Sequence, residues 1–86
     1  MTEKEARLLI GGRIREARRY RGLTQLVLGK RLYMSQTLIS AIEKGKAPIS
    51  ASLIRRVSEE LRVSVLYLMG YEARICVIAE KKPLYR

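Results

Sequence analysis

The fold is decided by residues 23–45, LTQLVLGKRLYMSQTLISAIEKG. Thr24 and Ser35 carry hydroxyl groups that can accept a hydrogen bond from an orphan amide at a helix start, so each marks a candidate N-cap. Leu28 and Leu32 lie four residues apart, on one face of the helix that would follow Thr24. Apolar residues also recur at helical spacing behind Ser35. The stretch therefore predicts two short helices joined by a tight turn.

The outward face of the second helix is short and polar. It consists of Gln36, Thr37, Ser40 and Lys44, and Gly45 and Lys46 follow at its end. A helix face that serves only solubility more often carries Glu and Lys. Gln, Thr and Ser can instead hydrogen-bond to base edges in a major groove. This pattern predicts a face that reads DNA.

The composition agrees with a nucleic-acid partner. The chain has 86 residues, which suits one domain with a modest core, and its formal net charge is +10 with a pI near 10.4. The alternatives on charge alone are a merely soluble basic protein or one attracted to anionic lipid. RNA also fits the charge, but a reader helix without aromatic residues suits duplex DNA better than stacked single strands.

Several other classes of function are disfavoured. The single Cys76 allows no internal disulfide, and one Cys without His cannot build a zinc cluster. The usual general base is also missing, so we expect no enzyme activity and no cofactor, and no small-molecule ligand is evident. No apolar run approaches the roughly 20 residues of a membrane span, and the N-terminus lacks the features of a signal peptide. We expect a cytoplasmic protein, associated with the nucleoid when bound to DNA.

The N-terminal region predicts a helix with a weak point. Thr2 and Glu5 have the spacing of a capping box. Gly11 and Gly12 each cost about 1 kcal/mol relative to Ala inside a helix. They mark either a break or the start of the first domain helix.

The first domain helix is expected to bury Ile14 and Ala17 and to end at Gly22. Its other faces carry Arg13, Arg15, Arg18, Arg19 and Arg21. These side chains are either a solvated face or a positive stripe that steers phosphates.

Two further helices should follow the motif. Ser50 can cap a helix with a buried stripe formed by Leu53, Ile54, Val57 and Leu61. Ser64 can cap a last, almost wholly apolar helix that Gly70 ends. Its apolar side chains, Val65, Leu66, Leu68 and Met69, are expected in the core.

The period changes after Tyr71. Residues 73–79 are rich in β-branched residues and predict a strand. A single strand in a helical chain has an unpaired edge, and the simplest partner is the same strand of a second copy. The dimerisation candidates are therefore Ile75, Cys76, Val77 and Ile78. The alternative is a tail that folds along its own domain or is disordered in isolation.

The sequence resembles the phage repressor and Cro-like helix-turn-helix family, also called the xenobiotic-response-element type. The resemblance covers about residues 12–70. The matching positions are Ile14-Arg15, Arg18, Gly22-Leu23-Thr24-Gln25, Ser35-Gln36, Ile39-Ser40, Ile42-Glu43-Lys44-Gly45, Pro48 and Leu61-Arg62-Val63-Ser64.

The resemblance implies roles for residues in and around the motif. The base contacts would be Gln36, Thr37, Ser40 and Ala41, with the Gln36 amide suited to adenine. The phosphate contacts would be Gln25, Ser35, Lys44, Gly45 and Lys46. Gln25 would also brace Gln36, and the Gly45 contribution would come from its backbone amide. Arg18 and Glu43 would form the family's internal ion pair between the first helix and the reader helix.

The chain departs from the family pattern in three ways. Tyr33 replaces a turn glycine, so either it accepts a positive φ or the turn differs. Leu26 and Val27 replace polar residues and would cover the N-terminal segment or contribute to a protein interface. Ala41 replaces a long polar side chain, which implies fewer direct contacts or a thymine methyl contact.

Together these patterns predict a mainly α, five-helix, lambda-repressor-like domain with a short C-terminal strand. Residues 1–70 would form the DNA-binding domain, with the motif at 24–44 and the recognition helix at about 35–44. Residues 71–86 would form a dimerisation arm. The expected function is a sequence-specific regulator, a repressor that binds an inverted-repeat operator as a homodimer. The alternative is an antitoxin-like or coactivator-like module that binds a protein partner and has weak DNA specificity.

Overall fold

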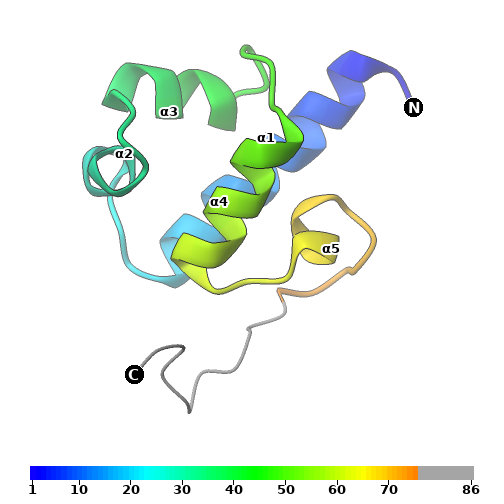
Figure 1. The fold of residues 1–86 in the computed structure, drawn as a ribbon. Helices are drawn as coiled ribbons and strands as arrows, with labels where there is room; N and C mark the ends of the chain where they lie inside the picture. Colours follow the sequence, from blue (N-terminus) through cyan, green and yellow to red (C-terminus); the bar gives the residue numbers. More distant parts are fainter. Residues whose placement is uncertain (76–86) are drawn as a thin grey trace.

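The computed structural model describes residues 1–75, and this part of the chain contains five helices. They are α1 (Glu3–Tyr20), α2 (Gln25–Leu32), α3 (Gln36–Glu43), α4 (Ala51–Leu61) and α5 (Val65–Leu68). In Figure 1, α1 and α4 occupy the middle of the molecule, with α2 and α3 on one side of them and α5 on the other. The predicted mainly helical, five-helix fold is confirmed.

Each helix begins at a side-chain cap that the sequence predicts. The caps are Thr2, Thr24, Ser35, Ser50 and Ser64, and each side chain accepts a hydrogen bond from a backbone amide of its own helix. At the start of α1 the capping box is complete: the Thr2 amide donates to Glu5 over 2.8 Å and the Glu5 amide donates to Thr2 over 3.1 Å. These caps satisfy amides that have no partner within the helix, and so fix where each helix starts.

The two glycines of α1 neither break the helix nor begin it. The helix runs unbroken from Glu3 to Tyr20. Gly11 is buried, and a Cβ atom at this position would lie only 2.2 Å from the Ile42 carbonyl oxygen. A Cβ atom at Gly12 would have no neighbour within 4 Å. The first glycine therefore allows the backbones of α1 and α3 to touch, at the cost of helix propensity.

The core contains the apolar residues that the helical periods predict, except for three residues at α5. Its buried members are Ile14, Ala17, Leu28, Leu32, Ile39, Ile42, Ala47, Leu53, Ile54, Val57, Leu61, Val63, Tyr67 and Leu68. The prediction that α5 is buried throughout was wrong for Val65, Leu66 and Met69, which are exposed. A helix of a single turn has one inward side, and Tyr67 and Leu68 occupy it.

Tyr67 joins α5 to α1. Its hydroxyl donates to the Glu16 carboxylate, and the Arg13 guanidinium lies 4.5 Å from the centre of its ring. Burial, followed by the hydrogen bond to Glu16 and the charge of Glu16, raises the pKa of Tyr67 to about 12, while Arg13 opposes the shift. Arg13 also donates to the Glu72 carbonyl oxygen over 2.9 Å. The chain that follows α5 is thereby held against α1.

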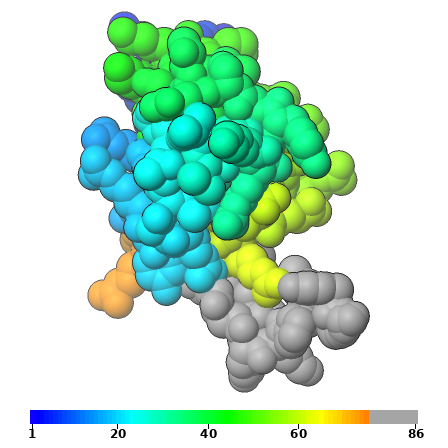
Figure 2. Space-filling model, turned by 90° about the vertical axis from the view of Figure 1, so that its left-hand side faces the viewer, coloured from blue at the N-terminus to red at the C-terminus, as the bar shows by residue number. Residues whose placement is uncertain are grey.

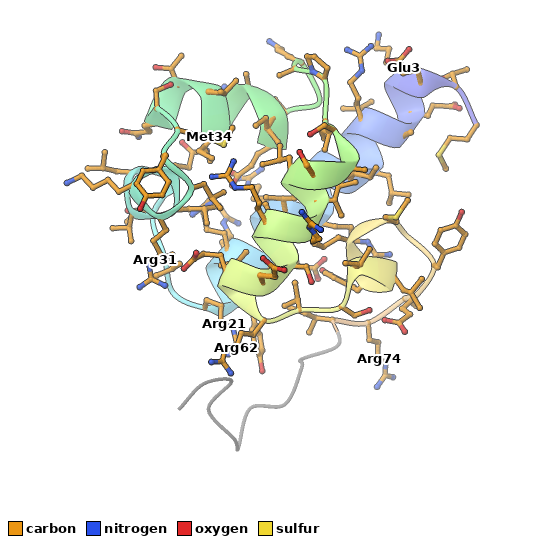
Figure 3. The ribbon with its side chains drawn as sticks, in the orientation of Figure 1. Glu3, Arg21, Arg31, Met34, Arg62 and Arg74 are labelled. Carbon is orange, nitrogen blue, oxygen red and sulfur yellow. The ribbon has the colours of Figure 1, made fainter. Side chains whose placement is uncertain are left out.

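Three of the five arginines expected on a solvated face or a positive stripe make contacts within the protein. Arg13 is engaged at Tyr67 and Glu72, and Arg18 is buried in an ion pair. Arg21 donates to the Leu61 carbonyl oxygen over 2.7 Å, at the end of the molecule opposite α3 (Figure 3). Sequence spacing could not show these interactions because their acceptors lie far away along the chain.

The predicted C-terminal strand falls largely outside the described residues. Residues 73 and 74 form a bend and residue 75 has no regular structure, so no strand is seen at these three described positions. Ile75 is partly buried and packs against the core. Cys76, Val77 and Ile78 lie outside the described residues. Among the helices of residues 1–75, none has the length and apolar character that crossing a membrane requires.

Candidate nucleic-acid interface

The predicted base-contact residues gather around one surface hollow. It has a volume of about 400 Å³ and is lined by Gln25, Gln36, Thr37, Ser40, Ala41, Lys44 and Lys46. All four predicted base contacts are in this set, with three of the five predicted phosphate contacts. Gln36 and Thr37 are exposed, while Ser40 and Ala41 are half-buried at the floor. Within residues 1–75 the Gln36 amide makes no hydrogen bond to protein, so it is available to a ligand.

The turn between α2 and α3 contains Tyr33 in the left-handed conformation, with φ 60° and ψ 43°. Of the two alternatives at this position, the structure shows the positive φ. The ring is 92% exposed, so no packing compensates for the backbone conformation. Figure 2 views the molecule from the side of α2, with α3 above it.

Gly29 sets how closely α2 approaches the turn before α3. A Cβ atom here would lie 2.5 Å from the Met34 carbonyl oxygen, and the Met34 amide donates to the Gly29 carbonyl oxygen over 2.8 Å. A larger side chain would push the two helices apart. Gly29 therefore fixes the angle at which α3 projects from α2.

A buried ion pair joins α1 to the end of α3. The Arg18 Nε and Nη2 atoms donate to the two carboxylate oxygens of Glu43 over 2.7 and 3.0 Å. The Glu43 side chain is 2% exposed. Arg18 also donates to the Leu23 carbonyl oxygen over 2.8 Å. A planar guanidinium bound at two points has a fixed direction, so the pair orients α3 as well as tethering it.

Gln25 extends this network to α2. Its amide nitrogen donates to Glu43 Oε1 over 3.0 Å. This is a different contact from the brace to Gln36 that the resemblance implies, and it links Gln25 to the buried carboxylate. One amide proton is used there, and the second remains free to bind a phosphate.

A glycine turn ends α3 and presents two lysines. Gly45 has φ +75°, and its amide donates to the Ile42 carbonyl oxygen over 3.0 Å. The amide is thereby used inside the protein, so the expectation that it binds phosphate is replaced by a conformational role. Lys44 and Lys46 are both exposed beside it. The hydroxyl of Ser35 accepts from the Leu38 amide over 3.1 Å, which leaves its own proton available for donation.

Sequence reasoning missed two residues that position this surface. Gly11 permits the backbone contact with Ile42 described above. Leu8 lies against Gly45, where a Cβ atom would come within 2.8 Å of Leu8 Cδ2. Gly11 falls three residues before Ile14, on the inward side of α1, and that register could have identified it. Within residues 1–75, no group of three or more potential metal-ligating side chains forms.

Comparison with known proteins adds independent findings. A family model described as helix-turn-helix matches residues 14–68. The HTH-type transcriptional regulator PrpR of Mycobacterium tuberculosis is 32% identical over 62 residues, which are 72% of this chain and 13% of PrpR. The chain thus spans a small part of the length of that relative.

Two solved structures share the fold. The restriction-modification controller protein C.AhdI from Aeromonas hydrophila matches with a TM-score of 0.72 at 22% identity, over 79% of this chain and 99% of C.AhdI. A hypothetical transcription factor, NHTF from Neisseria, matches with a TM-score of 0.70 at 25% identity, over 80% of this chain and 79% of NHTF.

Proposed function

Because the chain belongs to the helix-turn-helix family of DNA-binding regulators, as the sequence predicted, we propose that it is a sequence-specific repressor. It binds double-stranded DNA as a homodimer on an inverted-repeat operator in the cytoplasm. Residues 1–70 act as the DNA-binding domain, and α3 enters the major groove. We propose residues 71–86 as a dimerisation arm that continues from this domain.

The observation that supports this proposal most directly is the composition of the hollow at α3. Gln36 can donate and accept at adenine N6 and N7, and Thr37 and Ser40 offer smaller hydrogen-bonding groups beside it. Ala41 offers a methyl group that suits a thymine methyl. These four side chains form a reading surface, and the buried Arg18–Glu43 pair holds it in place.

Phosphate contacts would surround this reading surface. Lys44 and Lys46 flank it at one end of α3, and Ser35 lies at the other end. The remaining amide proton of Gln25 supplies a further donor from α2. Such contacts set the register on the duplex and most of the salt dependence, while base contacts set the sequence preference.

The exposed apolar side of α5 supports a dimer. Val65, Leu66 and Met69 are exposed there, with Leu66 at 52%, and Tyr71 follows at 75%. Apolar side chains gathered on one short segment are a common feature of surfaces that bind protein. We propose that this segment, the dimerisation face (residues 65–71), meets its counterpart in a second copy. The two reader helices would then enter major grooves about 34 Å apart.

A second candidate function is binding of a protein partner. Leu26 and Val27 are exposed on α2, whereas Leu8 and Leu9 lie against Gly45 and Gly70. Of the two roles expected for Leu26 and Val27, this placement favours a protein interface. An apolar groove of about 420 Å³ between α3 and α4 also favours it, lined by Met34, Leu38, Ile42, Pro48, Ile49, Ser50, Ser52, Leu53 and Arg56.

Selection from random duplex DNA at near-physiological salt tests the main proposal. We expect enrichment of an inverted repeat with half-sites about one helical turn apart. Enrichment of nothing, with binding that disappears as salt rises, would refute sequence-specific recognition and favour the protein-binding function.

Two exposed residues then provide a matched comparison on the selected operator. Gln36→Ala should relax the preference at one base pair by roughly 1–3 kcal/mol. Lys46→Ala should weaken binding to all sequences and lower the slope of log K against log salt by about 1. A uniform loss in Gln36→Ala would assign Gln36 to the phosphate contacts instead.

A further inference from the structure

Leu8 packs on the turn that presents the two lysines. A Cβ atom at Gly45 would lie 2.8 Å from Leu8 Cδ2, 3.0 Å from its Cγ and 3.1 Å from its Cα. The positive φ of Gly45 already favours glycine at this position. The close approach of Leu8 is a second, independent constraint. Leu8 thus limits where the backbone between Lys44 and Lys46 can lie.

The next residue, Leu9, packs on the turn after α5. A Cβ atom at Gly70 would lie 2.4 Å from Leu9 Cδ2. The Gly70 amide donates to the Tyr67 carbonyl oxygen over 3.0 Å, and the Tyr71 amide donates to the Leu66 carbonyl oxygen over 2.8 Å. Leu9 therefore contacts the turn that leads from α5 to the exposed Tyr71.

Both leucines belong to one unbroken helix. Figure 1 shows this first part of α1 running past the end of α3 and above α5. The helix is capped at Thr2 and is held against the α3 backbone at Gly11. It is therefore stiff over the turn that contains both contacts. The family model begins at residue 14, so these contacts come from a segment that precedes the matched region.

We infer that Leu8 and Leu9 are positioning residues. They couple the dimerisation face to the turn at residues 44–46, which presents Lys44 and Lys46 to phosphates. A second copy that packs on residues 65–71 restrains Gly70, and Leu9 transmits this restraint to α1. Leu8 then holds the backbone of Gly45 and the lysines beside it. This inference deepens the proposed function and rests on it, because both the dimer and the phosphate contacts belong to that proposal.

The first test uses backbone hydrogen exchange in the free protein, without DNA. Leu8→Ala should speed exchange at the amides of Gly45 and Lys46, which donate to Ile42 and Ala41, by about tenfold relative to α4. Leu9→Ala should speed exchange at Gly70 and, through α1, at Lys46.

Leu26→Ala is the matched control for this test. Leu26 is 48% exposed and Leu8 is 49% exposed, so both substitutions remove the same side chain from helix surfaces of equal exposure. The control should leave the Gly45 and Lys46 amides unchanged. An unchanged Lys46 amide in Leu9→Ala would overturn the coupling. An equal rise at every amide would also overturn it, because this would show a loss of global stability only.

The second test measures affinity for a single half-site and for the full selected operator. Leu8→Ala should weaken half-site binding and lower its salt dependence. Leu9→Ala should weaken half-site binding less than Leu8→Ala does, and it should reduce the advantage of the full operator by about fivefold or more. Equal loss on both DNAs in Leu9→Ala would contradict the coupling. If the wild-type protein binds no duplex, the proposed function fails, while the exchange pattern still shows whether the two turns are coupled.

Discussion

Replacement of Arg18 by methionine should destabilise the protein strongly, because it leaves a buried carboxylate without its counter-charge. The Glu43 side chain is 2% exposed and accepts hydrogen bonds from two Arg18 nitrogens and from Gln25. Methionine fills much of the same volume but supplies no donor. Only the neutral amide of Gln25 would remain to compensate the charge.

The expected loss in the free energy of unfolding is about 3–5 kcal/mol, the range for removing one partner of a buried pair. In a domain of this size, each kcal/mol lowers the melting temperature by about 4–8 °C. The Arg18→Met variant should therefore melt at least about 12 °C below the wild type. Circular dichroism of the helical signal measures this shift directly.

The double variant Arg18→Met/Glu43→Met separates charge from packing. It removes both buried charges and keeps apolar volume, so it should recover most of the lost stability. It should not recover affinity for the operator, because Gln25 loses the carboxylate that holds its amide.

Two outcomes would refute this reasoning. A loss below about 1 kcal/mol in Arg18→Met would show that the pair behaves like an exposed one. A double variant whose loss equals the sum of the two single losses would show that the charges are not coupled.

Three further predictions concern the backbone and pH. Gly11→Ala should lower the free energy of unfolding by about 1–3 kcal/mol, because its Cβ atom would clash with the Ile42 carbonyl oxygen, whereas Gly12→Ala should raise it by up to about 1 kcal/mol. Denaturant unfolding measures both variants, and equal effects would show that the close contact is absent. Tyr33→Gly should raise stability by up to about 1 kcal/mol, since it relieves a left-handed residue that packs on nothing; a lower melting temperature would contradict this. The pKa of Tyr67 lies at about 12, above its ordinary value of 10.0, so the unfolded chain loses this proton first and stability falls as pH rises between these values. Unfolding of Tyr67→Phe over this pH range should lack that part of the fall, and an identical pH dependence would contradict the shift.

The local signals in the sequence predicted the helices well. Thr24 and Ser35 cap α2 and α3 because their short hydroxyl side chains bind amides of their own helices, which is a local interaction. Leu28 and Leu32 are buried because the helical period places them on one side. The family resemblance predicted the Arg18–Glu43 contact, which the structure shows.

The failures share a physical cause, which is contact between residues distant in sequence. The sequence presents Gly11 only as a residue that weakens a helix, because it does not show that the Ile42 carbonyl lies beside it. Arg21 reads as a surface cation, but its guanidinium binds the carbonyl of Leu61. Leu66 was expected in the core because the composition of a short apolar helix does not tell which of its side chains face other elements of the fold, and Leu66 is exposed.

The buried and exposed sides of α3 contribute differently to stability, and this difference determines which of its residues can be substituted. Ile39, Ile42 and Glu43 face the core and α1, and they determine whether the helix is held in place. Gln36 and Thr37 are exposed and contribute little to folding. Under the proposed function, substitutions at these exposed positions would alter the preferred operator without loss of stability. A new DNA specificity would then be accessible to evolution through single substitutions that the rest of the fold tolerates.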